Sequence, residues 1–277
     1  MRASWGVLQR DKRLLLFPLL SGIACLLVLA SFAIPIFITG YWHPPTRDAD
    51  IVQKVAYYAT LFAYYFVNYF IITFFNVAIV ACAIERLRGG EPTLNFGLRE
   101  ATNRLPLILG WALLSATVGL VPKVIEDRSE KVGQIVAGLL GMAWGVMSYL
   151  VVPTLVVEKK GPLAALKSST AMLKRTWGEQ LAGNFGFGAV LGLLSLPGLV
   201  LVAAAFYFGM ALHNNILAAV FGVCAIVFFL VMSLIQSALQ SIFQAAVYLY
   251  ASGDEGRATL GPRGFPVRLL QQAMEVK

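Results

Sequence analysis

The sequence predicts an all-α, polytopic membrane protein: a membrane helix bundle of six transmembrane spans with cytoplasmic amphipathic interfacial helices. The 277 residues are 58% hydrophobic and 13% charged, whereas soluble domains carry about 25% charged residues. The mean hydropathy is +0.75. Long apolar runs alternate with short polar connections, and about 20 apolar residues suffice to cross a bilayer. We therefore expect a single integral membrane domain over residues 1–277.

Six apolar runs are long enough to be spans. The first is longer than the apolar core of a signal peptide, and no cleavage pattern of small residues precedes Tyr41, so we expect it to be retained. The fifth is expected to break near Pro197-Gly198, and the sixth is too long for one straight crossing. The fourth has three glycines that would let a neighbouring helix approach closely, namely Gly138, Gly141 and Gly145. The predicted spans cover about residues 14–39, 55–84, 105–121, 132–157, 181–208 and 216–250.

Amphipathic segments join some of these spans. We expect interfacial helices at about residues 2–12, 93–104 and 162–178, and a cytoplasmic tail at 251–277. The third of these helices organises the chain, because Pro162 suits a first helical turn and long apolar runs flank the segment. Its basic residues lie off the apolar stripe, which is typical of a helix in a membrane–water interface. The stripe itself has helical spacing and consists of Leu163, Leu166, Thr170, Leu173 and Trp177.

Two stretches of the chain repeat one pattern of span, helix break, amphipathic helix and span. Ile84-Glu85-Arg86 precedes Gly89-Gly90-Glu91-Pro92, much as Val157-Glu158-Lys159-Lys160 precedes Gly161-Pro162. The repeat predicts two span–interfacial helix–span units. We also consider a third unit, formed by the first and sixth spans with their flanking segments.

The distribution of charge predicts the orientation. With six spans, 17 of the 22 Lys and Arg residues lie on the side of the two termini. Positive charge in short loops favours the cytoplasmic side, so we expect both termini in the cytoplasm and a bacterial inner (plasma) membrane location. All 14 acidic residues lie outside the spans or at their ends. Ion-coupled carriers and proton pumps usually need ionisable groups at mid-membrane, so this pattern argues against those classes.

The sequence carries no recognisable chemistry of catalysis. The three cysteines, Cys25, Cys82 and Cys224, lie inside apolar runs without a CxxC spacing or a nearby His, which predicts packing rather than a disulfide or metal site. No nucleophile–base or metal constellation is visible, so we predict no catalytic residues, no metal, no cofactor and no enzyme activity. The basic residues form no dense block with interleaved aromatics, which argues against nucleic acid as a partner.

Two sets of residues are candidate sites. The first is a polar stripe in the last span, where serines and glutamines each recur every four residues; it either lines a polar cavity or joins helices by hydrogen bonds. The second is basic and contacts anionic lipid headgroups or a partner protein, or serves only topology and anchoring. The stripe is Ser233, Gln236, Ser237, Gln240, Ser241 and Gln244. The headgroup or partner contacts are the basic residues Lys159, Lys160, Lys167, Lys174 and Arg175, together with Trp177.

Two segments carry a family resemblance. They are Ser4-Trp5-Gly6-Val7-Leu8 with Asp11 to Gly22, and Gly161 to Ser169 with Lys174-Arg175-Thr176-Trp177. The chain resembles an uncharacterised family of bacterial six-span integral membrane proteins, a domain of unknown function. It is also similar, more distantly, to membrane domains found beside glycerophosphodiester phosphodiesterases. The resemblance implies an inner-membrane location and supplies no activity. The soluble phosphodiesterase domain is not present in this sequence, so the resemblance does not imply its chemistry.

Two hypotheses of function follow. In the first, the protein is non-enzymatic and engages anionic membrane lipids or a partner protein, including a second copy of itself, through its basic cytoplasmic interfacial helices. In the second, it is a transporter or channel for a small solute that uses the polar stripe of the sixth span.

Overall fold

The computed structural model of the chain describes residues 6–9, 11–39, 50–126 and 130–252. Within these ranges it describes the side chains of all residues except 38–39, 123–126, 130–134 and 175–191. The described part of the chain contains helices and no strand, and six helices are long and apolar enough to cross a membrane. The prediction of an all-α polytopic bundle is therefore confirmed.

The helices follow the predicted order along the chain. A short 3-10 turn leads into the first long helix, and a π-helical turn closes the long helix α8. In order, the elements are η1 (Lys12–Leu15), α2 (Leu16–Thr39), α3 (Ile51–Leu87), α4 (Leu94–Thr102), α5 (Leu105–Glu126), α6 (Glu130–Ser148), α7 (Val151–Val157), α8 (Pro162–Phe206), η2 (Tyr207–Ala211) and α9 (Asn215–Ala251).

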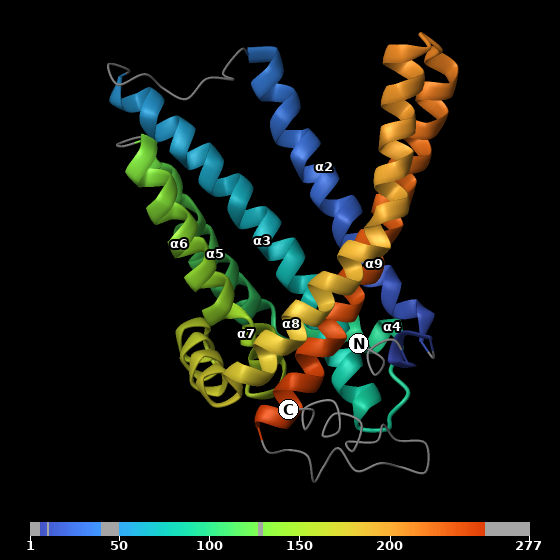
Figure 1. Ribbon diagram of the computed structural model, residues 1–277. Helices are drawn as coiled ribbons and strands as arrows, with labels where there is room; N and C mark the ends of the chain where they lie inside the picture. Colours follow the sequence, from blue (N-terminus) through green and yellow to red (C-terminus); the bar gives the residue numbers. More distant parts are fainter. Residues whose placement is uncertain (1–5, 10, 40–49, 127–129, 253–277) are drawn as a thin grey trace.

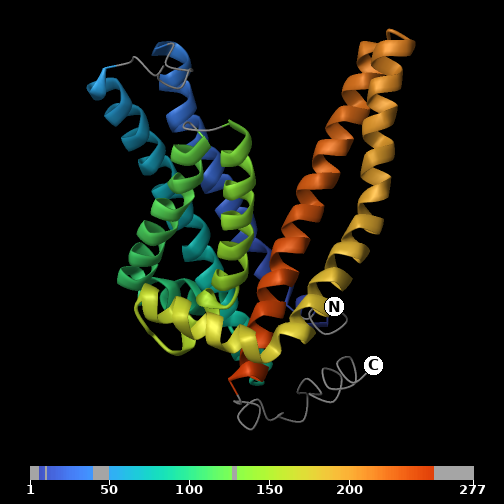
Figure 2. The same ribbon diagram turned by 60° about the vertical axis from the view of Figure 1, so that its left-hand side comes forward.

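The long helices form a V that is closed at one end (Figures 1 and 2). One side of the V holds α2, α3, α5 and α6. The other side, here called the arm, consists of α9 and the rising part of α8. The two sides meet at the base, where α4, α7 and the first part of α8 lie. The base therefore joins all the spans, and the opposite ends diverge.

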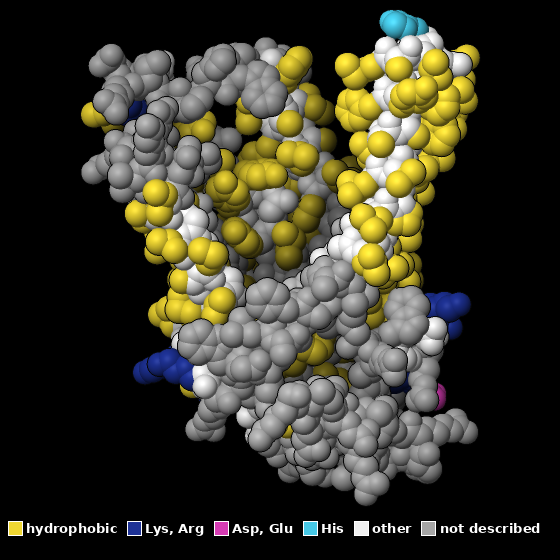
Figure 3. Space-filling view, in the orientation of Figure 1, with side chains coloured by type: hydrophobic (Ala, Val, Ile, Leu, Met, Phe, Trp, Pro, Cys, Tyr) yellow, Lys and Arg dark blue, Asp and Glu magenta, His cyan; other side chains and the backbone are white. Residues whose placement is uncertain are grey.

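Exposed apolar side chains cover much of the surface above the base. Hydrophobic residues coat the arm and line the hollow between the arm and the rest of the molecule, whereas Lys and Arg side chains appear at the base (Figure 3). Leu27 and Val200, for example, are 67% exposed. Such a belt is what a bilayer would cover, because its hydrocarbon core is as apolar as these side chains.

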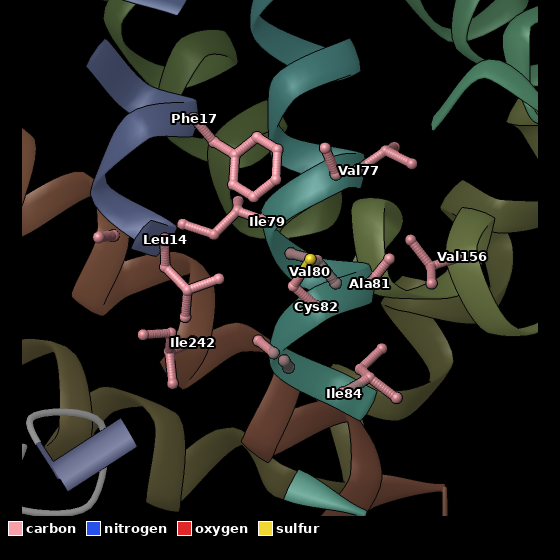
Figure 4. Packing of buried hydrophobic residues seen from close by; sticks show 14 of the residues in the cluster. Leu14, Phe17, Val77, Ile79, Val80, Ala81, Cys82, Ile84, Val156 and Ile242 are labelled. Carbon is pink, nitrogen blue, oxygen red and sulfur yellow. The ribbon is translucent and has the colours of Figure 1, made fainter. Parts of the chain in front are cut away.

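The core lies at the base and is built around the end of α3. Its eight consecutive residues 77–84 are all buried, as expected of a helix end that is apolar on every side. Leu14 and Phe17 pack against it from the start of the chain, Val156 from α7 and Ile242 from α9 (Figure 4). The base is thus a packed core that holds elements from both sides of the V.

The predicted fourth span, 132–157, is interrupted in the structure. Helix α6 ends at Ser148 and α7 begins at Val151. Pro153 explains the break, because it has no N–H for the carbonyl of Tyr149 and its ring crowds that carbonyl. The Ser169 hydroxyl of α8 fills the gap, since it accepts a hydrogen bond from the backbone N–H of Leu150 (3.1 Å) and donates one to the carbonyl of Met147 (2.7 Å).

The predicted interfacial helix 162–178 and fifth span 181–208 form one continuous helix, α8. Its first part lies crosswise at the base, and the helix then bends and rises as part of the arm (Figures 1 and 2). We call Pro162–Lys174 the crosswise segment. The expected break at Pro197-Gly198 is absent, because α8 continues to Phe206. Glycine in a helix costs only about 1 kcal/mol, and membrane-spanning helices tolerate proline because neighbouring groups satisfy the freed backbone carbonyl, so neither Gly178 nor Pro197-Gly198 has to end the helix.

Other bounds differ by a few residues. The predicted span 55–84 becomes α3, Ile51–Leu87, and 216–250 becomes α9, Asn215–Ala251. The predicted interfacial helix 2–12 falls partly outside the described residues, of which 6–9 are helical. The tail 253–277 also lies outside them. Nothing lies within 4 Å of the positions that a side chain would occupy at Gly138, Gly141 and Gly145, so these glycines serve no close helix contact in the described part of the chain.

The two repeated segments share a local geometry. Each reverses the chain through a residue with positive φ, Gly89 at 91° and Lys159 at 51°. An amphipathic helix follows in each case, α4 or the crosswise segment. Thr93 caps the start of helix α4, because its side chain accepts a hydrogen bond from the N–H of Phe96 (3.2 Å). These turns bring both amphipathic helices back under the spans that precede them.

Candidate functional site at the base

Glu158 joins three helices at the base. It directly follows α7. Its carboxylate accepts hydrogen bonds from the Ser168 hydroxyl of α8 (3.1 and 3.0 Å) and from the Tyr248 hydroxyl of α9 (3.1 Å). It also pairs with the Lys160 ammonium. This carboxylate therefore fastens the end of α7 to the crosswise segment of α8 and to α9.

The environment of Glu158 favours its charged form. Burial by itself raises the pKa of the carboxyl, because it disfavours the charged state. Hydrogen bonds from Lys160, Ser168 and Tyr248, together with the positive charge of Lys160, outweigh that effect and hold the pKa below its ordinary value. The carboxylate is thus ionised at neutral pH and is able to accept all of these bonds.

Arg104 closes the end of α7 from the other side. Arg104 is buried, with 7% of the residue exposed. It donates to the carbonyl of Val156 from Nε (3.1 Å) and Nη2 (2.7 Å), and its Nη1 pairs with Glu100 (2.6 Å). The last carbonyls of a helix have no partner within it, and a cation suits that end of the helix dipole. Arg104 therefore caps α7 and links it to α4 and α5.

Three of the predicted basic residues form a row. Lys160, Lys167 and Lys174 follow one another at seven-residue spacing. Seven residues are nearly two turns, which places Lys167 and Lys174 on one face of the crosswise segment, whereas Lys160 lies in the turn before this segment and pairs with Glu158. All three are exposed, and we call them the lysine row. Lys159 is also exposed, but its left-handed φ marks the turn after α7. The side chains of Arg175 and Trp177 lie outside the described residues.

The buried face of the crosswise segment differs from the predicted apolar stripe. Its buried residues are Ala165, Ser169 and Leu173, whereas Leu163 of the predicted stripe is 70% exposed. Helical spacing places Leu163 between the buried face and the lysine row. The segment thus packs on the base with one face and leaves an exposed leucine beside an exposed basic face.

The structure leaves much of the polar stripe of α9 exposed. Ser233, Gln236 and Gln240 are exposed, Ser237 and Gln244 are half-buried, and Ser241 is buried. The Ser241 hydroxyl donates to the carbonyl of Ser237 in its own helix (3.0 Å). Ala238, Ile242, Ala245 and Leu249 form the buried face of α9. Helical spacing places the three glutamines opposite that face, so the glutamines of the stripe do not enter the packed core.

Several residues of this site were not among the sequence candidates. Ser168, Ser169 and Tyr248 act through partners on other helices, and Arg104 was counted only for topology. The sequence did contain one indication of a role for Arg104, because it lies between an amphipathic helix and a span. Tyr248 gave no signal, because its partner Glu158 is 90 residues away. In the described part of the chain, no group of three His, Cys, Asp or Glu residues is placed to hold a metal ion.

Fold and surface together define an all-α protein of the multi-pass membrane class. The model of a family of unknown function (DUF6159) matches residues 55–259. The chain belongs to this family. The match includes the crosswise segment and α9. It does not include residues 4–22, the first of the two segments in which we saw a family resemblance.

No curated protein and no solved structure matches the chain. The more distant resemblance to membrane domains beside glycerophosphodiester phosphodiesterases stays a prediction.

Proposed function

We propose that this protein is a non-enzymatic membrane protein that binds anionic lipid headgroups with the crosswise segment of α8. The observation that carries the proposal is that Lys167 and Lys174 of the lysine row are exposed on one face, beside exposed Leu163, of a helix that packs on the base. A Lys near an anionic membrane surface contributes about 1 kcal/mol to binding. The backbone positions of Lys167 and Lys174 are about 10 Å apart along the helix, so the two side chains can contact separate headgroups.

The same proposal assigns the base to the cytoplasmic face of a bacterial plasma membrane. Of the described basic residues, those of α4, the α7–α8 turn and the crosswise segment all lie at the base. Positive charge in short loops favours the cytoplasmic side, where anionic lipids attract it. A protein partner on the same basic face, or a second copy of the chain, is the competing occupant.

Lipid retention in nanodiscs tests the proposal. The protein is placed in phosphatidylcholine nanodiscs with increasing phosphatidylglycerol, and bound lipid is measured by native mass spectrometry. The double variant Lys167→Gln, Lys174→Gln should bind phosphatidylglycerol about 25-fold more weakly, because each Lys contributes about fivefold. The control Lys12→Gln, Arg13→Gln removes equal charge from exposed positions outside the row.

An equal loss in both double variants would show a general charge effect and contradict a specific row. Unchanged binding of phosphatidylglycerol in the Lys167→Gln, Lys174→Gln variant would also contradict a specific row. A protein that co-purifies in stoichiometric amount, and is released by that variant only, would replace the lipid with a partner. The second hypothesis, a transporter or channel for a small solute, stays a prediction.

A further inference from the structure

One side of α9 faces neither the core nor α8. The core side carries Ile242, which packs with the end of α3 at the base. The side toward the rising part of α8 lies between Phe228 and Phe229, which both lie against Gly198. Helical spacing places a third row of residues roughly 100° or more from each of these two sides. We call this row the α9 seam: Ile226, Leu230, Ser233, Ser237, Gln240 and Gln244.

The α9 seam has the exposure and the spacing of a helix-packing surface. Ile226, Leu230, Ser233 and Gln240 are exposed, and only the other two members, nearer the base, are half-buried. The members recur at alternating intervals of four and three residues. This is the spacing at which two helices interdigitate along a left-handed coiled coil. The seam is therefore shaped to receive one more helix.

The depth of the seam in the membrane follows from the core. Leu14 lies beside Ile242 there (Figure 4). Six residues past Leu14, Leu20 of α2 is 44% exposed and belongs to the apolar belt. Ser233 is nine residues past Ile242 on the same side of the base, about 13 Å along the helix axis. Ser233 and the apolar members of the seam therefore lie within the apolar layer, and Gln240 lies near its edge.

The polar members of the seam are uncharged and self-complementary. Amides and hydroxyls both donate and accept hydrogen bonds, so each can pair with an identical group. Within the described residues, no side chain of another element bonds to Ser233, Gln240 or Gln244. Helix α9 contains no Asp, Glu, Lys, Arg or His, so two such helices meet without charge repulsion. Hydrocarbon offers these groups no donor or acceptor.

We propose that the α9 seam is the interface between two copies of this chain, related by a two-fold axis along the membrane normal. Copies that insert in the same orientation present identical residues at identical depth, so their α9 helices run parallel. Gln240 then pairs with its counterpart in the second copy, and one polar pair of this kind fixes the register of two packed helices. The interface does not depend on the proposed lipid binding, because the lysine row lies on another helix.

Cysteine cross-linking in native membranes tests the interface. The three native cysteines are replaced by alanine, and the seam variants are Ile226→Cys, Ser233→Cys and Gln240→Cys. A disulfide needs two Cβ atoms about 4 Å apart. With copper phenanthroline as the oxidant, we expect each seam variant to form covalent dimers about tenfold faster than cysteines elsewhere on the helix, because a parallel two-fold pairing brings identical seam positions together.

Val227→Cys and Val231→Cys are the matched controls. Both valines are exposed at the depth of the seam, and helical spacing places them on another side of α9. Equal cross-linking of seam and control positions would show random collision and overturn the proposal. Cross-links confined to the controls, or to a different protein, would overturn it as well.

The strength of association provides a second measurement. Copies labelled at His213→Cys with a donor or an acceptor dye are reconstituted in phosphatidylcholine vesicles, and energy transfer is measured as the protein is diluted with lipid. Gln240→Leu should lower the association constant about tenfold, because the amide pair makes two hydrogen bonds that each contribute about threefold. Unchanged association of Gln240→Leu would contradict pairing through the seam.

Two further variants separate this effect from other changes. Asn68→Leu also removes an amide from a spanning helix, but that amide donates to the carbonyl of Tyr64 in its own helix (2.9 Å), so association should persist. The Lys167→Gln, Lys174→Gln variant should associate like the wild type even where it loses phosphatidylglycerol. A loss of association in either variant equal to that of Gln240→Leu would overturn the assignment to the seam.

Discussion

At the scale of single residues, Glu158 connects its charge state to the stability of the base. Its folded pKa lies below the ordinary value of 4.5, so its bonds to Ser168, Tyr248 and Lys160 stabilise the fold fully above that pH. The stabilisation is lost as the pH falls through the folded pKa. We expect the melting temperature of the purified protein to fall below about pH 4.5, and to fall less in Glu158→Gln, which should also be about 1 kcal/mol less stable at pH 7.

The control for this experiment is Glu91→Gln, an exposed glutamate of the first repeated turn. Its melting temperature should follow that of the wild type at every pH. If the melting temperature of Glu158→Gln falls in acid as much as that of the wild type, the carboxylate does not couple the three helices. Tyr248→Phe provides a second check, because it removes one of the bonds that lower the pKa and should diminish the effect of pH.

The residues of the base also show what sequence alone can and cannot predict. The lysine row was predictable because helical spacing is a local property of the chain. The partners of Glu158 were not, because Tyr248 is 90 residues away and a tyrosine near a span end is usually an interface anchor. The stripe of α9 was recognisable as a pattern, but the direction in which it faces depends on how α3, α7 and α8 pack around it.

At the scale of elements, hydrophobic length predicted the spans well and their interruptions poorly. The break after Ser148 depends on Pro153 and on the Ser169 hydroxyl from another helix, so only half of its cause is local. The reverse error occurs in α8, where we predicted an end at residue 178 and a break near Pro197-Gly198, but the helix continues through both. Apolar residues that face the core and those that face lipid are alike in sequence, so the bend of α8 and the V could not be predicted.

Gly97 allows helix α4 to dock on the spans. A Cβ at this position would lie 2.7 Å from Cys82 Sγ and from Phe17 Cζ, and 2.9 Å from the carbonyl oxygen of Ala78. The backbone oxygen cannot move without disturbing α3, so we expect Gly97→Ala to destabilise the protein by about 1–3 kcal/mol. Thermal unfolding in detergent measures this loss.

The matched control is Gly138→Ala in α6, where nothing lies within 4 Å of the added carbon. Alanine favours helix there by about 1 kcal/mol, so this variant should be as stable as the wild type or more stable. A Gly97→Ala protein that also melts at or above the wild-type temperature would show that α4 does not pack this closely on α3.

At the scale of the whole molecule, the packed core and most of the described charges share one end, whereas Asp50 and Lys54 lie at the opposite end of α3. The residues that bind the two sides of the V together, such as Val80, Leu155 and Ile242, are all at the base, and so are Arg104, Glu158 and the lysine row. The diverging ends have exposed apolar surfaces instead, which depend on lipid for cover. We infer that the base sets the fold, and that the surrounding lipid determines how far apart the two sides stand.

The same polarity predicts which ends of the helices face which side of the membrane. Lys167 lies at the base, and His213 lies in the turn between α8 and α9 at the opposite end. Single cysteines at these positions, after replacement of Cys25, Cys82 and Cys224 by alanine, report the orientation with a membrane-impermeant maleimide. His213→Cys should be labelled in intact bacterial cells and Lys167→Cys only in inverted membrane vesicles, because the positive end stays in the cytoplasm. Labelling of both in intact cells would contradict opposite placement, and the reverse pattern would place the lysine row outside, away from the cytoplasmic leaflet that our proposal requires.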